Sequence, residues 1–343
     1  MNKKWLKYII LLFAFVIVFC LYLIYNQFFG LNVRPKGDKA TIYIPEEASY
    51  EQAMDSVEAN LIIRNKKMLE WLAEKKKYQK LVKPGKYVID RPLNYNELIN
   101  ILRGGKQIPI TIIINNIRTL NELAGRIGGQ IEADSAEIIG FFSDPENYSK
   151  DGFKQEDVIS VFIPDTYEFY WNTGAGKLYN RMLREYRKFW TRERLHKSEE
   201  IGLTPVEVST LASIVDEEAL KAEEKPRIAG VYLNRLKRGI PLQADPTIKF
   251  AINNFKVNRI LFKHLETDSP YNTYKHAGLP PGPIECPSIN GIDAVLNAEK
   301  HDYIYFAAKS DFSGYHNFSR TLSEHNRYAN QYQRELNKRR IYR

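Results

Sequence analysis

The sequence is poor in the residues that thiol and metal chemistry require. Its 343 residues include two cysteines, Cys20 and Cys286, which lie far apart and form no CxxC or other metal-type spacing. We therefore expect no disulfide between them and no cysteine-based metal site. The sequence also lacks the GxSxG, SxxK, P-loop and GxGxxG patterns. Their absence argues against serine hydrolase and nucleotide chemistry.

Basic charge is present without the pattern that is typical of nucleic-acid binding. The net charge is +9, and part of the excess lies near the C-terminus, where we expect a basic tail at residues 336–343. No array of Arg and Lys alternates with aromatic residues, so we expect no nucleic-acid partner. The basic tail is either a solvated surface or is attracted to an anionic one, such as lipid headgroups or a carboxylate-rich polymer.

One long hydrophobic run occurs, close to the N-terminus. Residues 1–7 are basic, and Tyr8 to Tyr25 carry no charge, about 18 residues that can cross a hydrocarbon core. The bulky residues that follow do not resemble a signal-peptide cleavage site, so we expect a retained transmembrane helix at 8–28. The positive-inside bias places the N-terminus in the cytoplasm, although Arg34, Lys36 and Lys39 oppose it. This predicts a single-pass protein of the cell (inner) membrane with the remaining chain outside the cytoplasm.

The rest of the chain has the mixed pattern of an α+β protein. A linker at 29–40 precedes a small α+β module at 41–109, with strands at 41–44 and 85–90, a helix opening at Ser49 and helices at 66–77 and 94–102. A connecting α+β segment at 110–160 repeats the order of a strand and a helix with a capping box, here at Thr119. A mostly helical domain at 161–335 follows, with helices at 178–193, from Thr204, at 226–238 and at 323–338, and a loop-lined cleft.

A helix that ends in three acids is the most informative feature of the sequence. The helix opens with the N-cap Thr204 and ends with Asp216, Glu217 and Glu218. Acids at a helix C-terminus oppose the macrodipole, at a cost of a few tenths to about 1 kcal/mol each. Such a cost without a structural gain favours a function, unless a basic partner elsewhere offsets it.

The helical periodicity places Glu217 and Glu218 on different faces of the helix. Glu218 continues the apolar stripe of Leu211 and Val215, whereas Glu217 lies above Thr210 and a serine, on the wetter face. A carboxyl group among apolar neighbours has a raised pKa, because burial disfavours its charged form. A glutamic acid that is protonated near neutral pH is the proton donor that a glycosidic oxygen requires.

Two loop motifs carry further candidates. In L-Q-A-D-P-T, Asp245 precedes a proline and is held extended or in a turn. It is either a turn former or a cleft-wall residue, with Gln243 binding sugar hydroxyls. In Y-N-T-Y, Tyr271 and Asn272 precede a stiff loop rich in Gly and Pro. Their flat faces and neutral donors and acceptors suit carbohydrate, and simple loop packing is the alternative.

The last candidate motif contains two histidines. His316 and His325 could form a base or metal pair, but no HExxH motif or nearby cysteine supports a metal. A hydrogen-bonded structural histidine is the more common case. We keep His316 as a candidate cleft contact and expect no metal site.

Seven motifs in order resemble one known family. They are F-I-P-D-T-Y, L-A-S-I-V-D-E-E, V-Y-L-N-R-L, L-Q-A-D-P-T, Y-N-T-Y, G-L-P-P-G-P-I and Y-H-N-F-S-R-T-L-S-E-H-N. With these motifs the chain resembles the YceG/MltG family of endolytic murein (peptidoglycan) transglycosylases; the match covers nearly all of residues 41–335, and the anchor matches too. The resemblance implies a LysM-like module near the membrane and a catalytic domain with a lysozyme-like active-site arrangement. It also implies an enzyme that cuts nascent glycan strands and limits their elongation, with peptidoglycan synthases as partners.

The resemblance also implies which residue is catalytic. The family pattern is E-x-E-[TS]; its second Glu falls on Glu218, its first position is Asp216 and its hydroxyl residue is Ala219 here. A lytic transglycosylase, a lyase, needs this one acid and no metal or organic cofactor, and it leaves a 1,6-anhydro end. Two alternatives remain: a hydrolase with Asp245 as the second carboxylate, and a wall-binding scaffold that does not cut.

Overall fold

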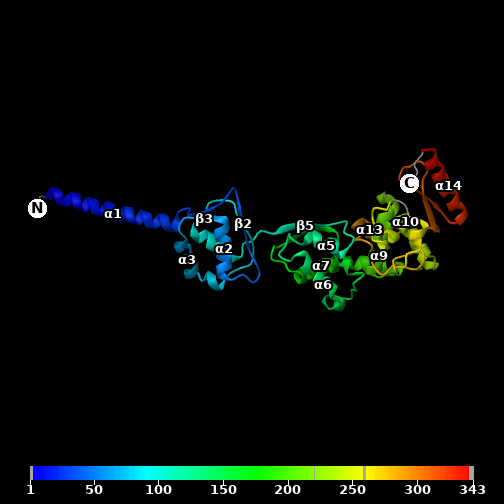
Figure 1. Ribbon diagram of the computed structural model, residues 1–343, viewed down its shortest axis with the longest axis horizontal. Coiled ribbons are helices and arrows are strands. Elements are labelled where there is room, and N and C mark those ends of the chain that lie inside the picture. Colours follow the sequence, from blue (N-terminus) through cyan, green and yellow to red (C-terminus); the bar gives the residue numbers. More distant parts are fainter. Residues whose placement is uncertain (1–2, 220, 258–259, 340–343) are drawn as a thin grey trace. The chain divides into compact units, whose positions relative to one another are not determined.

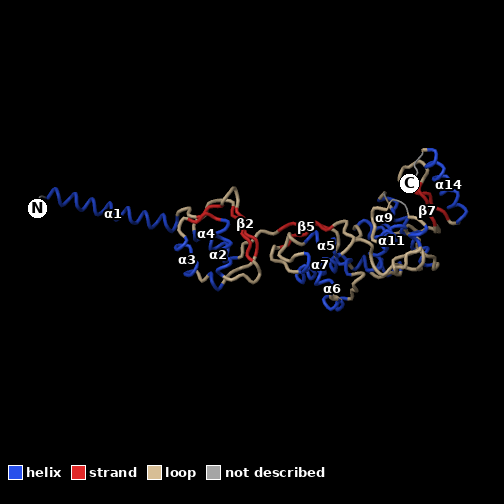
Figure 2. The backbone as a smooth tube through the Cα atoms, in the orientation of Figure 1, coloured by secondary structure: helices blue, strands red, loops and turns tan. Residues whose placement is uncertain are grey.

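The computed structural model describes residues 3–219, 221–257 and 260–339. The chain divides into two compact units. The first comprises Met1–Thr111 with the short segments Gln130–Ala133 and Glu168–Thr173, and the second comprises Ile112–Gly129, Asp134–Tyr167 and Gly174–Arg343. Figures 1 and 2 show a mixed α+β chain in which helices make up most of the second unit.

The first unit begins with a long apolar helix. Its elements are α1 (Lys3–Phe29), β1 (Val33–Pro35), β2 (Ala40–Ile44), α2 (Tyr50–Asn60), β3 (Leu61–Ile63), α3 (Lys66–Lys75), the 3-10 turn η1 (Tyr78–Lys80), β4 (Gly85–Ile89) and α4 (Tyr95–Gly104). One stretch of α1, Lys7–Phe29, is long and apolar enough to cross a membrane. The residues expected to form a linker at 29–40 include β1, which pairs antiparallel with β3.

The module after α1 has its own hydrophobic core. β2 pairs antiparallel with β4, from Ala40 opposite Ile89 to Ile44 opposite Gly85. Alternate residues of β2, such as Ile42, are fully buried against α2, α3 and α4. Local capping fixes the helices: Ser49 and Gln52 close the expected capping box of α2, with the Ser49 hydroxyl accepting from the Gln52 N–H at 3.2 Å.

The second unit is mostly helical. Its complete elements are α5 (Leu120–Ile127), α6 (Ser135–Ser143), the 3-10 turns η2 (Pro145–Asn147), η3 (Ser149–Asp151) and η4 (Val158–Val161), α7 (Ala175–Phe189), α8 (Arg192–Ile201), α9 (Pro205–Glu218), the 3-10 turn η5 (Ala222–Glu224), α10 (Lys225–Lys237), α11 (Asp245–Ala251), α12 (Phe262–Leu265), α13 (Ile289–Leu296), β7 (Tyr305–Ala308), β8 (His316–Ser319) and α14 (Leu322–Lys338). Two further strands, β5 (Ile110–Ile114) and β6 (Asp165–Phe169), pair with each other. Helix α9 packs against α8, α10, α11 and α13 and is buried from Val208 to Val215. It is therefore the central helix of this unit.

Two expectations for this part of the chain need correction. The single helix expected at 178–193 is two helices, because Thr191 caps a new one by accepting from the Arg194 N–H at 3.4 Å. Thr119 does cap α5, but the repeated capping box is incomplete. The Glu122 carboxylate accepts from the Arg118 N–H at 2.9 Å instead of returning to Thr119. Of the expected basic tail, residues 336–338 belong to α14, and 340–343 lie outside the described residues.

Candidate active site

Glu218 is the last residue of α9 and lines an open cavity of about 460 Å³. The helix is started by the expected capping box, in which Thr204 accepts from the Glu207 N–H and the Glu207 carboxylate accepts from the Thr204 N–H at 2.8 Å. The cavity is lined by Glu218, Tyr232, Arg235, Leu242, Gln243, Asp245, Tyr274, Ile304, Tyr305, Phe306, Leu322, His325 and Asn326. Helices α9, α10 and α11, the β7–β8 hairpin and α14 thus all contribute to one site.

The Glu218 carboxyl is partly shielded from solvent and remains open to the cavity. Burial raises its pKa to about 7, and the nearby negative charge of Asp245 adds to this rise. The Tyr232 hydroxyl donates to Glu218 Oε1 at 3.3 Å and opposes the rise, since it favours the charged form. The group is therefore poised to give up and to take back a proton near neutral pH.

The face of α9 that carries Thr210 and Ser213 is more buried than its polar residues suggest. We expected Thr210 and Ser213 to mark a wetter side, but both are buried. Their hydroxyls donate to carbonyl oxygens of the same helix, from Thr210 to Val206 at 2.9 Å and from Ser213 to Thr210 at 2.7 Å. Such bonds satisfy a hydroxyl without water, and phase alone could not reveal them.

Gln243 lies in the cavity wall in an unusual backbone conformation. Its φ of 52° lies in the left-handed region, which costs a residue with a side chain about 1 kcal/mol or more. The Arg235 guanidinium donates to the Leu242 carbonyl at 2.6 Å and to Gln243 Oε1 at 3.3 Å, so the buried arginine holds the loop in place. Gln243 is exposed and lines the cavity.

Asp245 lies in the same cavity, in the first turn of α11. Pro246 follows it within that turn, so the Asp-Pro pair begins a helix. The Tyr274 hydroxyl donates to Asp245 Oδ1 at 2.6 Å and fixes the carboxylate. The structure therefore places Asp245 close enough to Glu218 to influence its pKa.

Three of the expected contact residues do not line this cavity. Asn272 is fully buried, and its amide donates to the carbonyls of Leu265 and Thr267 at 2.8 Å, which makes it a loop-forming residue. The Tyr271 ring packs against the Phe250 ring at a tilt, with centroids 4.6 Å apart, and lines a separate hollow.

The third of these residues, His316, lies on β8 and is half-buried. Its Nδ1 lies 2.9 Å from the Glu224 carboxylate, which also accepts from the His316 N–H at 3.0 Å. The ring therefore ties β8 to η5, outside the cavity lining. In the part of the chain that the structure describes, no group of three His, Cys, Asp or Glu is placed to hold a metal ion.

Several cavity residues were not identified from the sequence. Tyr232 and Arg235 are both buried on α10. From the sequence alone, such a tyrosine is interpreted as a core residue and such an arginine as a surface charge. His325 is half-buried and stacks on Tyr305 with ring centroids 5.3 Å apart. The proximity of α14 to this site is a long-range feature that no local pattern encodes.

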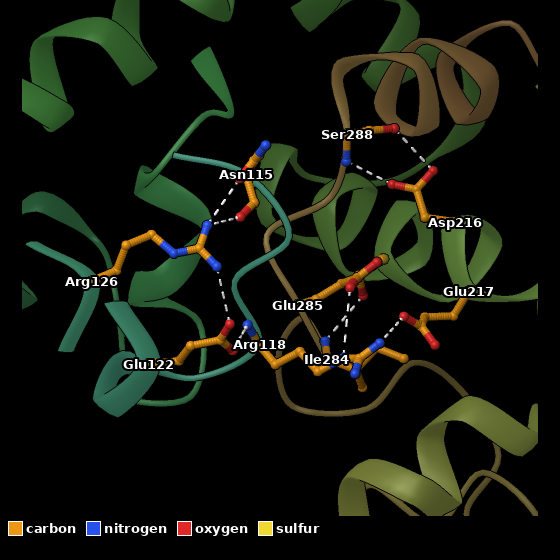
Figure 3. A network of polar contacts seen from close by, with 10 residues as sticks. Asn115, Arg118, Glu122, Arg126, Asp216, Glu217, Ile284, Glu285 and Ser288 are labelled. Atoms are coloured by element: carbon orange, nitrogen blue, oxygen red, sulfur yellow. Dashed lines mark hydrogen bonds and ion pairs between the residues drawn. The ribbon is translucent and has the colours of Figure 1, made fainter. Parts of the chain in front are cut away.

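The two other acids at the end of α9 have basic partners. Glu217 forms an ion pair with Arg118, whose Nε also lies 3.9 Å from Glu285 (Figure 3). Burial and the charge of Glu217 raise the pKa of Glu285. The Arg118 guanidinium also lies 4.5 Å from the Phe255 ring centroid. This network, remote in sequence, offsets the cost of an acid at a helix C-terminus.

Asp216 has a different set of partners. It accepts from the Ser288 N–H at 2.6 Å (Figure 3). It also forms an ion pair with Lys225 at 2.7 Å. A Cβ at Gly291 would lie 2.3 Å from Asp216 Oδ1, so only glycine allows α13 to approach this closely. Asp216 therefore joins α9 to α10 and α13, and Glu218 alone among the three acids lines the cavity.

The comparisons with known proteins agree with this architecture. The mixed α+β fold is that of YceG-like proteins: a crystal structure of a yceG-like protein from Listeria monocytogenes matches with a TM-score of 0.56 at 28% identity, covering 84% of this chain and 98% of that chain. The model of the YceG-like family matches residues 42–331. The chain belongs to the YceG-like family, which confirms the resemblance seen in the sequence.

Two relatives carry a functional name. The chain is 29% identical over 317 residues to the endolytic murein transglycosylase of Bacillus subtilis (strain 168), covering 87% of this chain and 86% of the relative. It is 28% identical to the endolytic murein transglycosylase of Streptococcus pneumoniae (strain ATCC BAA-255 / R6), covering 78% of this chain and 54% of the relative. The chain thus spans about half the length of the Streptococcus protein.

Proposed function

We propose that the chain is a membrane-anchored endolytic lytic transglycosylase that cleaves the MurNAc–GlcNAc β-1,4 bond of nascent peptidoglycan and so limits strand elongation. The observation that carries this proposal is the partly dry carboxyl of Glu218 in an open cavity, with its pKa raised to about 7. The names of the relatives support the same reaction class.

The reaction needs one acid that acts twice. Protonated Glu218 donates its proton to the oxygen that links MurNAc C1 to GlcNAc, and the bond between C1 and that oxygen breaks. An oxocarbenium-like centre develops at C1. The MurNAc 6-hydroxyl oxygen attacks C1, and its proton passes to the Glu218 carboxylate. The donor is thereby restored, a 1,6-anhydro ring forms and water is not consumed.

The neighbouring residues support these steps in different ways. The Tyr232 hydroxyl holds Glu218 Oε1 in place and stabilises its charged form between the two proton transfers. Gln243 and Asp245 contact sugar hydroxyls from the cavity wall. Asn272 acts indirectly, because its Oδ1 accepts from the Tyr274 N–H at 3.0 Å and so positions the tyrosine that holds Asp245.

Tyr271 and His316 complete the proposed set of site residues at greater distance. Tyr271 offers an aromatic surface to a longer glycan strand, from a hollow that it shares with Phe250. His316 supports the hairpin that carries Tyr305 and Phe306 into the cavity, through its contact with Glu224. We assign no metal or organic cofactor to this reaction.

The finer features of the fold belong to the same proposal. We take residues 41–109 as a LysM-like module, which the order β2, α2, α3, β4 and the antiparallel pairing of β2 with β4 support. Of the three acids at the end of α9, Glu218 alone lines the cavity, which supports a lysozyme-like arrangement within 161–335. We take α1 as a single-pass anchor in the cell membrane, with the N-terminus in the cytoplasm and glycan strands and peptidoglycan synthases as partners outside it.

One observation favours a hydrolase as the alternative. Asp245 lies in the cavity with Glu218, and its charge raises the pKa of Glu218, so two carboxyl groups are available. In a hydrolase, Asp245→Asn abolishes the product with a reducing end. In the proposed transglycosylase, the same variant still forms anhydro ends, at a lower rate.

Product masses separate these functions. Uncrosslinked glycan is digested with the wild-type chain, Glu218→Gln and the matched control Glu200→Gln, which changes an exposed acid of α8. We expect the wild type and the control to give ends that are one water lighter than reducing ends, and Glu218→Gln to give neither. Reducing ends would support the hydrolase, and a folded wild-type chain that does not cut would support a wall-binding scaffold.

A further inference from the structure

The first unit fixes its small module to the C-terminal end of α1. The buried side chain of Asn32 donates to the carbonyls of Asn26 and Gln27 at 3.1 Å and so caps the last turn of the helix. In that turn, the Phe28 ring contacts the Trp71 ring edge-to-face, with centroids 5.8 Å apart. Helix α1 also packs against α4. The position of the module relative to α1 is therefore set by direct contacts.

These contacts determine the depth of Trp71 if α1 crosses a membrane. Phe28 belongs to the last turn of the apolar stretch Lys7–Phe29, so it lies near the boundary of the hydrocarbon core. Trp71 lies one ring contact away, and its side chain is 44% exposed. Tryptophan favours this interface, because its ring is apolar and its N–H remains wet.

A cluster of cations begins beside this tryptophan. We define the basic cluster as Lys75, Lys76, Lys77 and Arg103, which lie at the C-terminal ends of α3 and α4. The Lys75 ammonium lies 5.9 Å from the Trp71 ring centroid. Lys76 is half-buried and donates to Asn100 Oδ1 on α4 at 2.6 Å, and burial and the charge of Arg103 lower its pKa. Within the described residues, none of the four forms an ion pair with a carboxylate.

Charges of both signs lie near Trp71 on α3. On the side of α2, Trp71 lines a hollow that is mostly acidic, with Glu51, Asp55, Glu58, Glu70, Glu74 and one lysine, Lys67. The cations of the basic cluster follow Trp71 toward the helix C-terminus instead. A partner at this end of the module must therefore offer negative charge and tolerate an exposed aromatic ring.

We propose that Trp71 and the basic cluster form a docking surface for the headgroups of anionic phospholipids in the leaflet that borders the C-terminal end of α1. The docking surface is continuous with the membrane-crossing helix, and its charge is complementary to that of anionic lipid. It rests on the proposed role of α1 as an anchor and not on the chemistry at Glu218. Docking there holds the module against the membrane surface.

Hydrogen exchange in nanodiscs tests the docking surface with the full chain. Exchange is measured by mass spectrometry in phosphatidylcholine discs and in discs that also contain phosphatidylglycerol. One cation near an anionic surface strengthens association about fivefold. We therefore expect residues 66–80 and 95–105 to exchange about fivefold slower, or more slowly still, in the anionic discs at low salt. The amides of β2 and β4 should exchange equally in both discs.

A charge-matched pair of variants controls for net charge. Lys75→Gln/Lys77→Gln/Arg103→Gln should abolish the protection by anionic lipid. The control Lys39→Gln/Lys86→Gln/Lys300→Gln, which removes three lysines outside the basic cluster, should retain it.

Equal exchange of the wild type in the two discs overturns the docking surface, and so does protection that survives in the first variant. Rapid exchange of α1 in both discs removes its premise as well, and the proposal falls with the anchor. Because no step of this test involves glycan cleavage, its failure is distinguishable from failure of the proposed reaction.

Discussion

The hydroxyl of Tyr232 gives the sharpest test of how the site tunes its acid. Tyr232→Phe removes the donor that lies 3.3 Å from Glu218 Oε1 and leaves the ring in place. A hydrogen bond of this kind favours the carboxylate by about 1 kcal/mol. Its loss should therefore raise the pKa of Glu218 above about 7, by about 0.7.

The sign of the change follows from which form reacts first. Only the protonated acid can begin the reaction, so kcat/KM falls as pH rises through the pKa of Glu218. In Tyr232→Phe this fall should move to higher pH, while the activity at low pH decreases because a weaker acid transfers its proton more slowly. The assay is the pH profile of anhydro-product formation from uncrosslinked glycan.

A neighbouring tyrosine provides the control. Tyr305 lines the same cavity, and its substitution by Phe should leave the fall in kcat/KM at its wild-type pH. If Tyr232→Phe shows an unchanged profile, or a fall that moves to lower pH, the hydrogen bond does not control the Glu218 proton and the reasoning is wrong.

Three further predictions concern stability. Glu218→Gln should stabilise the fold by up to about 3 kcal/mol at pH 8 and by much less at pH 5, as measured by denaturant unfolding. The reason is that the free-energy cost of ionising Glu218 in the folded state grows from pH 4.5 to its pKa of about 7 and persists at higher pH. A gain that is equal at both pH values would contradict this. Arg118→Gln should destabilise the fold by about 1–3 kcal/mol, and more at pH 8 than at pH 6, because Glu217 and Glu285 are left to repel each other; in the Glu285→Gln background, the pH dependence should shrink. Thr204→Ala should cost about 1 kcal/mol in the same assay through loss of the α9 cap, with no change in the pH profile of activity.

Local rules in the sequence are sufficient for the ends of the helices. Ser49 and Thr204 cap α2 and α9 where the sequence predicts it, because a cap involves residues only a few positions apart. The helix expected at 226–238 is α10, and it ends before Gly239, whose φ of 65° suits a residue that follows a helix. The mixed α+β character and the long apolar helix were predicted for similar reasons.

Contacts between distant segments decide what the sequence could not show. Arg118 reaches Glu217 from 99 positions away, so helical phase alone could not explain why an acid is stable there. Asn272 has the same polar side chain whether it binds a sugar or its own loop, and only the fold shows the carbonyls that it contacts. Tyr232 has the spacing of a core residue, and its hydroxyl becomes informative only beside Glu218.

The protonation state of Glu218 in the full chain tests the central claim most directly. Infrared difference spectra between the wild type and Glu218→Gln isolate the carbonyl band of this one protonated carboxyl during a pH titration, and spectra of Glu285→Gln identify the other buried acid. The band should disappear with a midpoint near pH 7. A midpoint near pH 4.5, the ordinary value for a glutamic acid, would show that the site keeps no proton for the sugar bond.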